Sequence, residues 1–120
     1  MIIQQIIQLL KDDEALQALI GSNIYPFSAP MKAIPCLVYV FTPSTDDGIK
    51  EQNKLEIRVI ANSYASALAI DSACRRVLLT IGDTGISDVL QCSINGGGTL
   101  QDANATHIIT YYTLINRKVN

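Results

Sequence analysis

One stretch, residues 54–81, constrains the fold more than any other, because a strand pattern in it changes directly into a helix pattern. Apolar and charged side chains alternate over 54–61, which predicts a strand with one face on a core. From Tyr64 the apolar residues recur at steps of three and four, as on one face of a helix. Ser63 is a suitable N-cap for that helix, and Gly82 is placed to end it. The helix is therefore expected to pack on the sheet to which its own strand belongs.

The rest of the chain predicts short helices before this unit and strands on both sides of it. The first helix covers 2–10, and the second is capped by Asp12 or Asp13 and ended by Gly21. The remaining expected elements are an extended piece at 24–26, a strand at 36–42 ended by Pro43, a polar loop at 44–52, strands at 53–61 and 87–94, a glycine break at 95–98 and a last strand at 106–117. The polar loop is longer than a hairpin needs, so it is either a flexible tip or a functional arm.

The order of these elements, α-α-β-β-α-β-β, predicts a single α+β domain over residues 1–120. Its sheet is expected to have four strands, mainly antiparallel, in the order 1-2-4-3, with a right-handed crossover through the helix. One long helix packs on this sheet, with two short N-terminal helices beside it. A chain of 120 residues suffices for one core but not for two.

The composition argues against several classes of function. Acidic residues outnumber basic ones by 11 to 9, and the net charge of −2 provides no basic surface for nucleic acid. The apolar start, residues 1–10, lacks a basic lead and is too short for a signal peptide or a membrane span. Cys36, Cys74 and Cys92 have no CxxC spacing, so we expect buried free thiols in a reducing cytoplasm rather than disulfides or zinc ligands.

Four features resemble chemical sites, and each has a simpler structural explanation. The glycines at 96–98 lack the helix and the lysine of a phosphate loop, so a hairpin tip is expected there. His107 has no recognisable nucleophile or acid partner, which favours an ordinary strand histidine. The carboxylates at 12–14 are explained by helix capping. Asp46 and Asp47 lack the ligand spacing of a calcium loop and are expected in a solvated turn. The sequence therefore predicts no enzyme, metal or cofactor.

The first and last long strands are apolar on both faces, and strands of this kind need cover on both. The central helix covers one face, and the N-terminal helices are too short to cover the other. A neighbouring copy is therefore expected to complete the cover. The candidate contacts to another subunit or partner are the charged residues beside this surface: Asp46, Asp47, Lys50, Glu51, Lys54, Glu56 and Arg58. Alternatively, Glu56 and Arg58 pair within one chain.

The order of motifs resembles the tail completion, or tail terminator, proteins of long-tailed bacteriophages. The resemblance extends from about Leu9 to Leu114. Its segments are Leu10-Lys-Asp-Asp-Glu-Ala-Leu16, Leu19-Ile-Gly21, Ile24-Tyr25-Pro26, Ala29-Pro30, Pro35 with Leu37-Val-Tyr-Val40, and Leu55 to Leu78 with its junction Ala61-Asn-Ser-Tyr-Ala65. Proteins of that family often have an aromatic residue after the strand's valine, where this chain has Ile60.

The resemblance implies a small mixed α/β subunit that forms a hexameric ring on the end of a tail tube. Such a ring stops tube growth and offers a docking surface to the head. Its implied partners are further copies of itself, the tail tube protein and the head connector protein. Its implied location is the tail–head junction of a virion assembled in the cytoplasm of a bacterial host, without catalysis, cofactor or membrane contact. A head-side neck or connector ring is the nearest alternative, and a small ligand-binding domain is a third interpretation.

Overall fold

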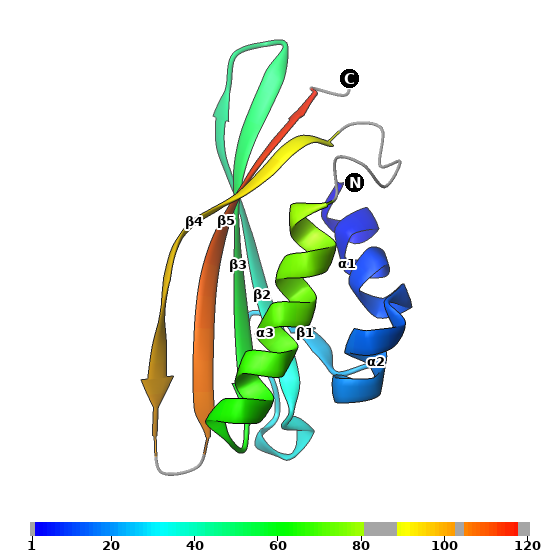
Figure 1. The fold of residues 1–120 in the computed structure, drawn as a ribbon. Coiled ribbons are helices and arrows are strands. Elements are labelled where there is room, and N and C mark those ends of the chain that lie inside the picture. The colour runs from blue at the N-terminus through cyan, green and yellow to red at the C-terminus, as the bar shows by residue number, and fades with distance from the viewer. Residues whose placement is uncertain (1, 81–88, 103–104, 118–120) are drawn as a thin grey trace.

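The computed structural model describes residues 2–80, 89–102 and 105–117, which form one layer of helices on one long sheet (Figure 1). The elements are α1 (Ile2–Asp12), α2 (Glu14–Ile20), β1 (Ile24–Pro26), the 3-10 turn η1 (Met31–Ala33), β2 (Cys36–Asp46), β3 (Lys50–Ala61), α3 (Tyr64–Leu79), β4 (Val89–Gln101) and β5 (Thr106–Arg117). The two N-terminal helices, the strand–helix unit and the last strand therefore lie where the sequence predicts them. Gly82, the expected end of the long helix, lies outside the described residues.

The predicted four-stranded sheet is wrong, because the described residues form a five-stranded mixed sheet with the order β1-β2-β3-β5-β4. The additional strand is β1, which runs parallel to β2 and pairs Ile24 with Leu37 and Pro26 with Tyr39. The other neighbours are antiparallel. A segment of three residues is too short to show a period of two in the sequence. Its backbone groups nevertheless gain partners by lying along the β2 edge.

The predicted polar loop at 44–52 is also wrong, because most of it is paired strand. β2 continues past Pro43 to Asp46 with a register shift, and β3 already begins at Lys50. The Asp47 carboxylate accepts hydrogen bonds from the backbone N–H groups of Ile49 at 2.9 Å and Lys50 at 2.6 Å, which makes the turn tight. The resulting β2–β3 hairpin projects past the end of the helical layer, in a molecule 46 Å long and 21 to 25 Å across (Figure 1).

The glycine run does not break β4, contrary to the sequence-based expectation. The strand continues through it with a register shift between Ile94 and Gly97, the mark of a β-bulge. A Cβ atom on Gly97 would collide with the backbone carbonyl oxygen of Ile109 on β5. Gly97 therefore allows β4 and β5 to approach closely at the bulge.

The central strand–helix unit forms as its pattern predicts. Leu55, Ile57 and Val59 of β3 are fully buried. The Ser63 side chain caps α3 by accepting from the Ser66 backbone N–H at 3.2 Å. The core between the helices and the sheet is completed by large buried side chains of α3 and of the other elements: Ile6, Leu10, Leu16, Leu37, Ile70, Leu78, Tyr112 and Leu114.

A buried polar cluster connects α3 to β5. Asp71 is only 5% exposed, although the helical pattern places it off the apolar stripe. Its carboxylate accepts from Arg75 Nε at 2.7 Å and from the Thr110 hydroxyl at 3.0 Å. These partners make burial of the charge tolerable and fix the helix on the sheet.

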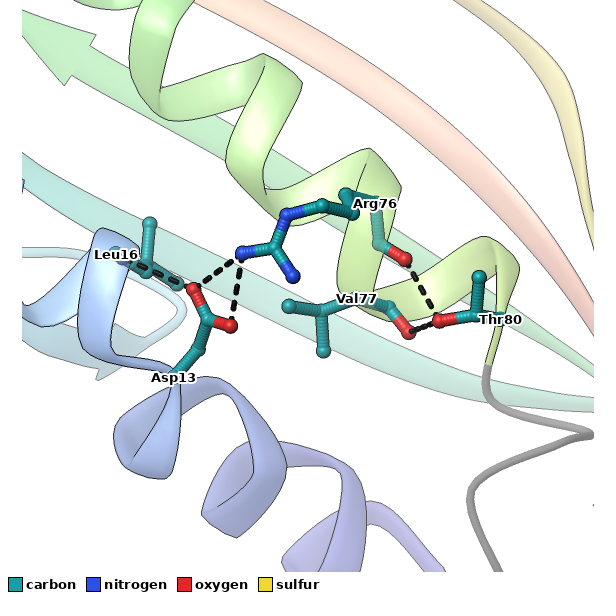
Figure 2. A network of polar contacts seen from close by, with 5 residues as sticks. All are labelled: Asp13, Leu16, Arg76, Val77 and Thr80. Carbon is teal, nitrogen blue, oxygen red and sulfur yellow. Dashed lines mark hydrogen bonds and ion pairs between the residues drawn. The ribbon is translucent and has the colours of Figure 1, made fainter.

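An exposed polar network connects the N-terminal helices to α3 (Figure 2). Asp13 caps α2 by accepting from the Leu16 backbone N–H at 3.0 Å. Both of its oxygens also accept from Arg76 Nη2, at 2.8 and 2.7 Å. The helix-capping explanation for the acidic residues is therefore confirmed at Asp13, which has a second role in joining the α1–α2 corner to α3.

Candidate subunit interface

The helices cover one face of the sheet, and the opposite face is only partly covered within the described part of the chain. Its cover is the segment around η1, where Ala29 and Ala33 pack on Cys36, Val38 and Ile60. We call the remainder of this surface the open face. By strand register it includes Val40, Thr42, Lys54, Glu56, Arg58, Leu100, Ile109, Tyr111, Thr113 and Ile115.

Three predicted contact residues lie together on the open face because they alternate with the buried residues of β3. Lys54 is exposed, and Glu56 and Arg58 are half-buried. Arg58 Nη2 lies 4.0 Å from a Glu56 carboxylate oxygen, which is a weak pair within the chain. Arg58 Nε is buried and has no hydrogen-bond partner among the described residues. A buried guanidinium N–H without a partner favours an acceptor that comes from outside the subunit.

Apolar side chains surround this charged row, and they are not among the contacts predicted from the sequence. Glu56 is flanked in register by Val40 on β2 and Tyr111 on β5. Tyr111 is 42% exposed and Leu100, further along the face, is 57% exposed. The sequence of β5 predicts such apolar contacts, because both faces of the strand carry apolar side chains and only one face lies under the helices. The open face thus combines exposed apolar area with a few charges, as interface surfaces do.

The other four predicted residues lie away from the open face, at the tip of the β2–β3 hairpin. They are Asp46, Asp47, Lys50 and Glu51. Hydrogen bonds from the backbone N–H groups of Lys50 and Ile49 hold the pKa of Asp47 below its usual value. Ile49 stands among these charges and is 75% exposed. The structure therefore divides the predicted contacts into two separate groups.

A groove that the sequence did not predict lies between α1 and the β1–β2 edge of the sheet. It has a volume of about 880 Å³. Its lining residues are Ile3, Gln4, Ile7, Gln8, Lys11, Pro26, Phe27, Tyr39, Phe41 and Pro43. Phe27 is 76% exposed and has a φ of 65°, a backbone conformation that is uncommon for a residue other than glycine. An exposed aromatic side chain held by a strained backbone suggests a contact surface.

The thiols are unpaired and largely buried, whereas the histidine has an acidic neighbour, Asp102, that the sequence did not predict. Cys36 and Cys74 are buried, Cys92 is half-buried, and all three are free. Burial raises the pKa of Cys92 to about 12 and that of Cys74 further. Such thiols remain protonated and are poor nucleophiles. His107 Nε2 lies 3.1 Å from a carboxylate oxygen of Asp102.

Two features are absent from the part of the chain that the structure describes. No group of three or more His, Cys, Asp or Glu side chains is arranged to hold a metal ion. No helix has the length and apolar character that crossing a membrane requires.

The fold resembles that of a solved virion component. A chain of the structure titled "Virion of native gene transfer agent (GTA) particle" matches with a TM-score of 0.72 over 94% of this chain and 92% of that chain. The two sequences are 16% identical, so the likeness concerns the fold. No protein-family model and no curated protein sequence matches the chain.

Proposed function

We propose that this protein is a structural subunit of a phage-like virion, and that it forms a ring which caps the tail tube and joins it to the head. The observation that carries the proposal is the fold shared, over nearly the whole of both chains, with a component of a gene transfer agent virion. The motif order described above independently resembles tail completion proteins. A role in assembly requires no catalytic group.

The open face supports an oligomeric form of this subunit. It exposes Tyr111 beside the Glu56–Arg58 row and Leu100 further along the face, and the helices pack on the other side of the sheet. Burying this surface against further copies would remove apolar area from water. A ring is the closed form of such a head-to-tail contact.

Binding to purified tail tubes is the direct test of the proposal. Negative-stain images of tubes mixed with the protein should show density at one tube end, and tubes should stop lengthening when the protein is added during assembly. A head-side connector ring would instead bind portal-bearing heads and leave tube ends bare. Protein that binds neither tubes nor heads, at concentrations where it is folded, contradicts a role at the joint.

A further inference from the structure

The groove beside β2 is suited to an apolar side chain supplied by another chain. β3 pairs with one side of β2 along this stretch. On the other side β1 pairs with β2 only as far as Tyr39, so no described strand lies on that side of β2 between Val40 and Pro43. An open strand edge offers backbone hydrogen bonds to an incoming chain. The apolar walls of the groove, Ile3 and Phe27 among them, offer burial to its side chains.

The tip of the β2–β3 hairpin presents an apolar side chain that complements the apolar walls of the groove. Ile49 is 75% exposed at its end. The turn that carries it is fixed by hydrogen bonds, since Asp46 accepts from the Gly48 N–H at 2.7 Å and Asp47 from the Lys50 N–H at 2.6 Å. A preorganised turn loses little conformational entropy when it binds.

The tip does not reach the groove of its own chain. β2 and β3 are paired up to Asp46 and Glu51, and β5 pairs with β3 as far as Lys50. These pairings direct the hairpin away from the helices, as Figure 1 shows. The tip is therefore available only to the groove of another copy.

The charges of the two surfaces are opposite. The tip carries three acidic residues, Asp46, Asp47 and Glu51, against one basic residue, Lys50. Lys11 is the one charged residue among the described residues that line the groove. Opposite charges at the rim orient two surfaces and speed their encounter.

We infer that the hairpin tip of one copy seats in the groove of the next copy, with Ile49 against the apolar walls and the acidic residues toward Lys11. The contact joins two different surfaces, so it is head-to-tail and repeats from copy to copy. It rests on the proposed function only in requiring that copies associate. The capping of tail tubes is a separate property that is measured separately.

Site-specific cross-linking tests the contact. The variant Gln4→Cys/Ile49→Cys, in a Cys92→Ser background, places one thiol at the groove and one at the tip. A short bismaleimide should convert it into a ladder of cross-linked oligomers. A mixture of the two single variants should yield only a cross-linked pair containing one of each. The control Asn62→Cys/Gln4→Cys replaces an exposed residue at the opposite end of β3 and should give no ladder.

Association measurements test the chemistry of the contact. Ile49→Asp should weaken self-association at least about tenfold without changing thermal stability, because Ile49 is exposed in the single subunit. Leu68→Asp adds the same charge at an exposed leucine of α3 and should leave association unchanged. Lys11→Glu should weaken association, and this effect should shrink when Asp46 and Asp47 are both changed to Asn, which keeps the turn acceptors.

Each outcome decides one of the two proposals. A copy-to-copy ladder supports the inference even if tube ends remain bare, and only the proposed function then fails. Tube capping without a Gln4–Ile49 cross-link overturns the inference and leaves the proposed function standing. Equal losses of association for Ile49→Asp and Leu68→Asp also overturn it. So does a small ligand or a different protein found in the groove of the assembled form.

Discussion

Asp13 shows how one side chain can hold two parts of this molecule together. It caps α2 and accepts from Arg76 of α3 with both carboxylate oxygens (Figure 2). Asp13→Ala should lower the free energy of unfolding by about 1–2 kcal/mol, from loss of the cap and of a partly exposed ion pair. Urea unfolding followed by circular dichroism measures this. Asp12→Ala, at the exposed neighbouring residue, should cost clearly less, and equal costs would contradict the double role.

The same carboxylate should make stability depend on pH in the acid range. The hydrogen bond from Arg76 lowers the pKa of Asp13 in the folded state below its ordinary value of 3.8. A lowered folded pKa means that the stabilisation is complete above the unfolded pKa and is lost as the pH falls through the folded pKa. The stability difference between the natural protein and Asp13→Asn should therefore be constant above about pH 5 and shrink below pH 4. Thermal melts at a series of pH values measure it.

Buried thiols give a further prediction at the residue scale. Burial raises the pKa of all three cysteines, so the thiolate form that reacts is scarce in the folded protein. Alkylation at pH 8 should be slow in the native state and fast in denaturant. Half-buried Cys92 is expected to react first. Rapid native labelling of Cys74 would contradict the burial seen here.

The bulge in β4 yields a prediction at the scale of the element. Gly97→Ala should destabilise the β4–β5 pairing by about 1–3 kcal/mol, because the new Cβ meets the Ile109 carbonyl and Gly97 has a φ of 156°. Gly98→Ala is the matched control, since no atom lies within 4 Å of the Cβ position there. Thermal melting and amide exchange of β4 measure the two variants. If both lose the same stability, the bulge is not the cause.

The elements that the sequence predicted correctly are those with a strong period. The alternation in β3 and the three- and four-residue steps in α3 recur over enough residues to be distinctive. The segment of β1 was predicted as an extended piece at 24–26, but its place in the sheet was missed because three residues carry no period. The hairpin and the glycine bulge were missed because polar residues and glycines indicate turns unless neighbouring strands pair with them. The burial of Asp71 could not be predicted from the helical pattern, because its partner Thr110 lies 39 residues away along the chain.

At the scale of the whole molecule, the sequence predicted that one sheet face lacks cover but not where the contacts lie. It selected charged residues, and the structure places these in two groups, one on the open face and one at the hairpin tip. The groove beside β2 depends on how α1 sits against a strand some 30 residues later. No local sequence pattern encodes how two elements far apart in the chain pack together, so a pocket between them appears only in three dimensions.

The open face provides the last prediction. Arg58 and Glu56 form a weak intrachain pair at 4.0 Å. In Glu56→Lys/Arg58→Glu the two charges exchange places, so the net charge and a pair of opposite charges are retained while the potential facing a neighbour is reversed. The free energy of unfolding should change by less than about 1 kcal/mol, because the two side chains are only half-buried and their pair at 4.0 Å is weak. Assembly should weaken much more, because charges at an interface set which surfaces meet. Sedimentation across a concentration series, alone and with tail tubes, measures assembly, and urea unfolding measures the fold. If unfolding shifts as much as assembly does, Glu56 and Arg58 serve the subunit rather than the contact between subunits.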